Sequence, residues 1–140
     1  MTRKTKRILI GLGSFVALGF LSFALLVYMY FFSETLHDKA SAIDCTLTWG
    51  RLEPIPASAQ QFKITKHGSA FTRGFRASFN APAADIEDWL QRSPGAREAI
   101  LTTPSPGIRH FKIKPGDGAE FAEVKVDDTQ NRVFIHVYWS

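Results

Sequence analysis

The chain has 140 residues, with 17 basic and 13 acidic side chains, a net charge of +4 and one cysteine. A single cysteine excludes an internal disulfide framework, so apolar packing must hold the fold together. The net charge arises in residues 1–7, because residues 33–140 carry thirteen side chains of each sign. A domain that is neutral overall lacks the basic footprint of a nucleic-acid-binding protein, so no nucleic-acid partner is predicted.

An uncharged apolar run occupies residues 8–32, directly behind the basic tail of residues 1–7. Twenty-five helical residues extend for about 37 Å, against about 30 Å for the hydrocarbon core of a bilayer. The run therefore predicts a single-pass transmembrane helix, an uncleaved signal-anchor whose first partner is the lipid bilayer. By the positive-inside rule, the N-terminus is cytoplasmic and residues 33–140 are extracytoplasmic. The predicted location is a bacterial inner membrane, with residues 33–140 in the periplasm.

The alternative is a cleaved signal peptide. Ala40, Ser41 and Ala42 satisfy the small-residue rule for cleavage after Ala42. The apolar run is longer than the usual 7 to 15 residues of a signal core, and the small residues lie well beyond its end, which favours the anchor. Within the run, Gly13 and Ala17 form a pair of small residues one helical turn apart, which predicts contact with another membrane protein.

Residues 33–60 are predicted to be a juxtamembrane segment and linker. The first ten continue the helix, residues 45–49 alternate like a short strand, and residues 50–60 contain two prolines and read as a loop. The folded domain is predicted to begin at Gln61 and to end at Ser140.

Alternation of apolar and polar side chains predicts two strands between residues 61 and 79, joined as a hairpin. A helix follows over residues 82–92, where Ile86, Trp89 and Leu90 form an apolar stripe. A second short helix is predicted from Pro94, with Ile100 as its buried residue, followed by a loop over residues 102–107.

Three further strands are predicted at residues 110–114, 121–127 and 133–139. The order ββαβββ, with short turns, predicts an α+β domain in which one helix packs on a face of a small antiparallel sheet. The predicted core comprises Phe62, Phe75, Phe79, Ile86, Trp89, Phe111, Val124, Val126 and Ile135.

The last strand is apolar on both faces. Phe134, His136 and Tyr138 share one face, so they are the predicted interface residues if the helix covers the other face. The alternative is that residues 45–60 or the second short helix cover them.

No motif for phosphate, dinucleotide or zinc-protease chemistry is present in the sequence. His110, His136 and Glu123 could ligate a transition metal if one sheet face held all three, but nothing fixes their register. Cys45 has no histidine partner that the sequence identifies. Neither an enzyme, a metal site nor a cofactor is predicted.

The predicted function is a non-enzymatic interaction domain, an accessory or assembly component of a membrane or envelope complex. The alternative is a domain that binds a glycan or small molecule through aromatic side chains such as Trp49, Trp89 and Tyr138. A hydrolase or metal enzyme with a hidden site is the least favoured hypothesis.

Overall fold

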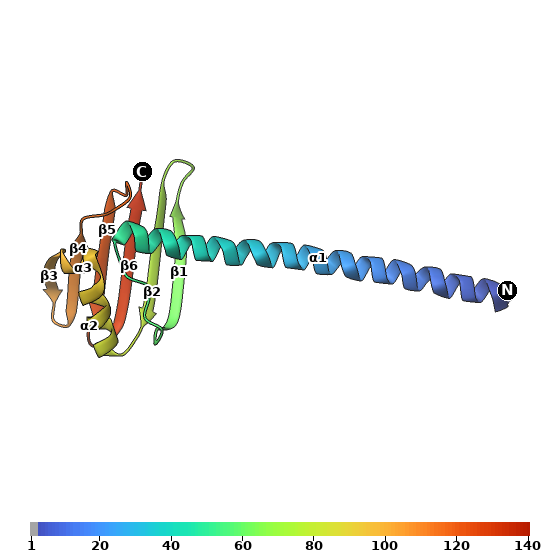
Figure 1. Ribbon diagram of the computed structural model, residues 1–140, viewed down its shortest axis with the longest axis horizontal. Coiled ribbons are helices and arrows are strands. Elements are labelled where there is room, and N and C mark those ends of the chain that lie inside the picture. Colours follow the sequence, from blue (N-terminus) through green and yellow to red (C-terminus); the bar gives the residue numbers. More distant parts are fainter. Residues whose placement is uncertain (1–2) are drawn as a thin grey trace. The chain divides into compact units, whose positions relative to one another are not determined.

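The computed structural model describes the backbone of residues 3–140 and the side chains of residues 16–30 and 38–140. The chain divides into a first unit, Met1–Asp38, and a second unit, Lys39–Ser140, which contains the sheet. Along the chain the elements are α1 (Arg3–Gly50), β1 (Gln60–Gly68), β2 (Arg73–Asn80), α2 (Ala83–Arg92), α3 (Pro94–Arg97), β3 (Ile100–Ser105), β4 (Ile108–Ile113), β5 (Phe121–Asp127) and β6 (Arg132–Trp139) (Figure 1).

Among the residues that the structure describes, no helix is apolar over a stretch long enough to cross a membrane. Residues 8–15 and 31–32 of the predicted span lie outside the described side chains. This finding overturns the predictions of a single-pass transmembrane signal-anchor and of an inner-membrane protein with a periplasmic domain.

The prediction of an α+β domain with an antiparallel sheet is confirmed. Six strands form one sheet in the order β1-β2-β6-β5-β4-β3, and every neighbouring pair is antiparallel. Strand β6 lies near the middle of the sheet, between β2 and β5 (Figure 1).

Strand β3 was not predicted. Residues 102–107 read as a loop, and Ile100 as a buried helix residue, whereas Ile100 pairs with Lys112 and is 69 % exposed. The strand lies at the edge of the sheet, where Pro104 is tolerated because its missing N–H costs no bond within the sheet. The register shifts between Thr102 and Ser105, on either side of that proline.

The short strand predicted at residues 45–49 is wrong, because these residues belong to α1. Ala42, Cys45, Thr46 and Trp49 lie at helical spacing and pack toward the core of the second unit, with Thr46 fully buried. The helix ends in a Schellman motif: Leu52 N–H donates to Leu47 O, and Arg51 N–H donates to Thr48 O.

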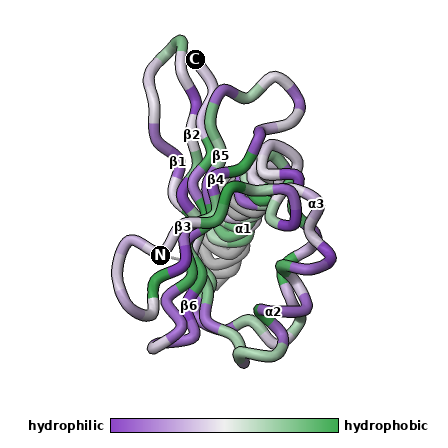
Figure 2. Tube along the Cα trace, turned by 90° about the vertical axis from the view of Figure 1, so that its left-hand side faces the viewer, coloured by the Kyte–Doolittle hydropathy of each residue, from purple (hydrophilic) through white to green (hydrophobic). Residues whose placement is uncertain are grey.

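The inner face of the sheet carries the core. All of the predicted core residues except Phe62 are buried, and Phe62 packs half-buried against the others. Trp89 of α2 meets Phe79 of β2 edge to face at 5.5 Å, and Trp49 packs on Phe75 of the same strand at 5.6 Å. In Figure 2, α2 and α3 lie on one side of the strands. The side chains of the sheet that do not enter the core point to the opposite face of the sheet, which we call the outer face.

Candidate functional site

The outer face is centred on β6. Val133, Ile135 and Val137 point into the core and are fully buried, so the pleat turns the alternate residues of β6 outward. Of the three predicted interface residues, Phe134 is 41 % exposed, and His136 and Tyr138 are partly exposed. The structure thus brings them together on one face, opposite the face that carries the core.

Other side chains share this face because the register fixes them beside β6. Phe121 of β5 pairs with Tyr138, and Arg76 of β2 pairs with His136. Phe121 is also 41 % exposed, and its ring lies 5.3 Å from the imidazole of His136. The outer face therefore combines aromatic rings with cationic side chains.

His67 of β1 is a member of this cluster that the sequence did not single out. It pairs with Gly74 of β2, and a Cβ at position 74 would overlap the His67 ring. The missing side chain lets the imidazole reach across β2, so that its Nε2 lies 3.2 Å from Nε2 of His136. The same ring stacks on Tyr138, with centroids 6.4 Å apart and planes 5° apart. Gly74 inside a strand pattern was the available signal for such a close approach.

Glu123 links the cluster to the strands on its other side. Its Oε2 lies 2.6 Å from His110 Nε2, and its Oε1 lies 3.2 Å from Lys125 Nζ and 3.7 Å from His136 Nδ1. Burial acts to raise the pKa of Glu123, but hydrogen bonds from Lys125 and His110 outweigh it and bring the pKa below its ordinary value. Glu123 is therefore a carboxylate at neutral pH.

The pKa of His136 shifts downward. Burial is the largest cause, followed by the positive charges of Arg76 and His67, whereas Glu123 acts in the opposite direction. A neutral His136 can share one proton with His67, since one Nε2 must donate and the other accept across 3.2 Å.

The structure brings together the three residues considered for a metal, His110, His136 and Glu123. Even so, among the described side chains no group of three or more His, Cys, Asp or Glu residues could hold a metal ion. The carboxylate of Glu123 is engaged by His110 and by the ammonium group of Lys125, which would repel a cation.

A hollow of about 230 Å³ opens on the outer face. Arg76 and Lys125 stand on the strands that flank β6, while Phe134 and His136 come from β6 itself. The full lining is Arg76, Ala77, Glu123, Lys125, Phe134, Ile135 and His136.

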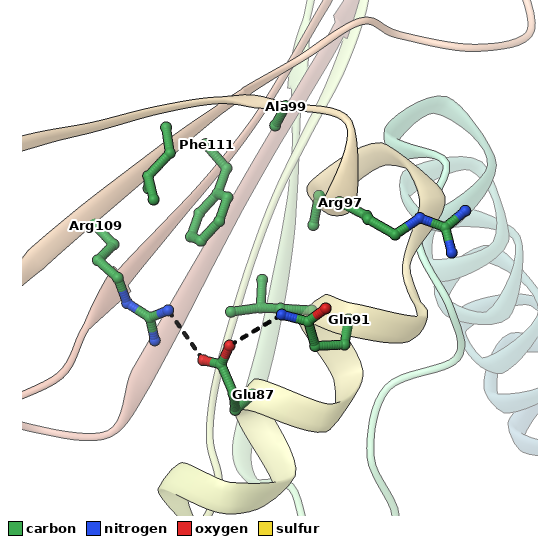
Figure 3. Close-up of a pocket in the computed structure, with 9 residues that line it drawn as sticks. Glu87, Gln91, Arg97, Ala99, Arg109 and Phe111 are labelled. Carbon is green, nitrogen blue, oxygen red and sulfur yellow. Dashed lines mark hydrogen bonds and ion pairs between the residues drawn. The ribbon is translucent and has the colours of Figure 1, made fainter.

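A second hollow, of about 210 Å³, lies between the α2–α3 segment and strands β3 and β4 (Figure 3). The charged side chains at one side of this hollow are paired with each other. Arg109 Nη1 donates to Glu87 at 3.0 Å, and the same guanidinium binds Asp128 at 2.8 and 2.9 Å. These bonds, chiefly those with Asp128, raise the pKa of Arg109. The arrangement is that of a structural clamp.

The aromatic residues proposed for a small ligand are mostly unavailable. Trp89 is fully buried, and its Nε1–H donates to Glu53 O at 2.9 Å, while Trp49 packs on Phe75. Both hollows are smaller than the roughly 300–1,000 Å³ of typical ligand pockets. Cys45 is half-buried against the core, which is the usual place of a structural cysteine.

The predicted helix contact at Gly13 and Ala17 stays a prediction. Gly13 lies outside the described side chains, and Ala17 is exposed on α1. No family model matches the chain, and no match is found among curated proteins or solved structures. A functional assignment therefore depends on the geometry of the outer face.

Proposed function

We propose that residues 39–140 form a non-catalytic interaction module that binds a partner protein through the outer face of its sheet. The observation that carries this proposal is the row of partly exposed aromatic side chains on two central strands, Phe121, Phe134 and Tyr138. Rings that could have been buried are instead left at the surface, and exposed apolar patches of this kind are typical of interaction sites.

Composition and rigidity both support a protein partner. Aromatic residues and arginine are enriched in protein interfaces, and this face holds both. The rings are also held in place: Arg132 lies 4.9 Å above the ring of Phe134, and Tyr138 stacks on His67. Side chains that are already ordered lose little entropy on binding, so more of the contact energy becomes affinity.

Site-specific photocrosslinking in cells tests the proposal. The full chain would carry a photoreactive phenylalanine analogue at position 134, and a matched variant would carry it at position 71. Phe71 is the appropriate control because it is 83 % exposed but lies in the β1–β2 turn. We expect one discrete crosslinked protein from position 134 that is absent from position 71.

The Phe134→Ala substitution provides a second measurement. In a chain that carries the analogue at position 121, Phe134→Ala should abolish the same crosslink, whereas Phe71→Ala should leave it intact. Equal labelling from positions 134 and 71, or a crosslink that survives Phe134→Ala, would contradict the proposal.

A further inference from the structure

The balance of basic and acidic side chains on the outer face differs from that of the whole domain. Its basic side chains come from five different strands and are Lys63, Arg76, Lys112, Lys125 and Arg132. Its carboxylates are Glu123 and Asp127. Five cations against two anions give this face an excess of positive charge, although residues 33–140 are neutral in total.

Both carboxylates are already engaged. Glu123 binds Lys125 and His110, as described above. Asp127 accepts hydrogen bonds from the Thr129 hydroxyl and from the backbone N–H groups of Thr129 and Gln130, which together bring its pKa below the ordinary value. Among the described side chains, Lys125 is the one cation of this face that is paired with either carboxylate, through Glu123, and its ammonium group keeps further N–H donors. The other four cations retain their capacity for an anion from outside.

The hollow concentrates this charge. Arg76 pairs with His136 and Lys125 pairs with Phe134, so the two cations stand on opposite sides of β6. Two strand spacings, about 9.6 Å, separate β2 from β5, and Arg76 and Lys125 are offset by two residues along the strands, about 7 Å. The backbone positions of the two cations are therefore about 12 Å apart, which leaves room for one carboxylate between the two long side chains. Phe134 adds an apolar wall, suited to the methylene groups of an acidic side chain.

A single acidic side chain fits the hollow better than a nucleic acid. Bases need free aromatic faces to stack on, and here Arg132 lies over Phe134 and His67 stacks on Tyr138. Glu123 also lines the hollow, so a phosphate dianion would meet more repulsion than a carboxylate monoanion. The volume of about 230 Å³ suits one side chain.

We propose that the hollow between Arg76, Lys125 and Phe134 is a carboxylate-binding site that recognises a glutamate or aspartate side chain of the partner polypeptide. This inference rests on the proposed function and names the chemistry of the partner. The guanidinium and ammonium groups supply the charged hydrogen bonds, and Phe134 contacts the carbon chain of the bound residue.

A pair of matched peptides tests the site. The probes are the N-acetylated, C-amidated hexapeptides Leu-Glu-Leu-Glu-Leu-Glu and its glutamine counterpart, titrated into the ¹⁵N-labelled full chain and followed by NMR. We expect the acidic peptide to shift the amide signals of Arg76, Lys125 and His136, and the glutamine peptide to bind at least threefold more weakly.

Substitutions distinguish binding in the hollow from a nonspecific effect of the protein's charge. Arg76→Gln and Lys125→Gln should each weaken binding of the acidic peptide about three- to tenfold, the usual range for a charged contact at a partly exposed site. Arg97→Gln and Lys66→Gln remove the same charges from exposed positions outside the outer face, on α3 and on the inner-face side of the edge strand β1, and should change the Kd less than twofold.

Three results would overturn the inference: no binding of the acidic peptide, equal binding of both peptides, or binding of oligo(dT) without binding of the acidic peptide. Inorganic phosphate that competes at equal concentration would also contradict it, by identifying a general anion site. A crosslink at position 134 together with any of these results would retain the interaction module and remove only the carboxylate site.

Discussion

The imidazole of His67 on β1 lies 3.2 Å from that of His136 on β6, although β2 separates the two strands. Gly74 makes this possible, because the ring crosses β2 where that strand has no side chain. One side-chain hydrogen bond thereby connects β1 with β6 across β2 on the outer face, and Tyr138 is stacked in place by the same ring.

A Gly74→Ala substitution should break this arrangement. The new Cβ displaces the His67 ring, which costs the hydrogen bond to His136, and we expect a loss of about 1 kcal/mol in the free energy of unfolding. Urea denaturation of the full chain measures the change.

The control is the same substitution in a His67→Ala background. With the ring absent, the alanine has room, and replacing glycine within a strand should stabilise the domain by about 0.5 kcal/mol. The sign of the Gly74→Ala effect should therefore reverse. The same destabilisation in both backgrounds would show that His67 is not the neighbour that requires glycine.

His136 should make stability depend on pH. It faces His67 from β1, Arg76 from β2 and Glu123 from β5, and its pKa in the fold is below the ordinary 6.5. The unfolded chain therefore takes up a proton first as the pH falls, so the free energy of unfolding should decline as the pH drops below about 6.5.

The His136→Gln variant should lose this part of the decline between pH 7.5 and 5.5, as measured by urea denaturation. Glu123 affects the free energy of unfolding in a different pH range. Its pKa is lowered from 4.5, so its contribution is present above that pH and is lost as the pH falls through the folded value, in both proteins. An unchanged slope between pH 7.5 and 5.5 in His136→Gln would remove His136 as the source.

Trp89 should tolerate substitution poorly, even by another aromatic residue. Trp89→Phe keeps most of the apolar contact with Phe79 but leaves the carbonyl of Glu53 without its donor. An unsatisfied buried acceptor costs about 1–3 kcal/mol, and we expect a loss of that size in urea denaturation. Trp139→Phe, at the partly exposed end of β6, should stay within about 0.5 kcal/mol. Equal effects at the two positions would contradict the role of this hydrogen bond.

The parts of the fold with a clear apolar period were predictable. The stripe of α2 and the alternation of β4, β5 and β6 follow directly from burial on one face. Strand β3 gives no such signal, because all six of its residues are exposed and one of them is Pro104. Residues 45–49 are too few to distinguish a strand from the last turn of α1.

The site was predictable only within one strand. The pleat places Phe134, His136 and Tyr138 on one face of β6, whichever strands lie beside it. Their neighbours depend on register, which one sequence does not fix, so His67, Arg76 and Phe121 could not be added. The concentration of cations on this face is also invisible in a total charge that sums to zero.

Arg109 should be replaceable by lysine only at a cost. Its guanidinium binds Asp128 through two nitrogens and Glu87 of α2 through a third, so one side chain connects β4 to a helix and to the β5–β6 turn. Lysine offers a point charge in place of this planar fork, and we expect Arg109→Lys to destabilise the domain by about 1 kcal/mol in thermal or urea unfolding. Arg97→Lys, in the same hollow but on the exposed side of α3, should have an effect below about 0.5 kcal/mol.

Because the clamp is electrostatic and partly exposed, the loss of stability in Arg109→Lys should become smaller at 1 M salt. A loss that is independent of salt would instead indicate packing of the Arg109 side chain on Phe111.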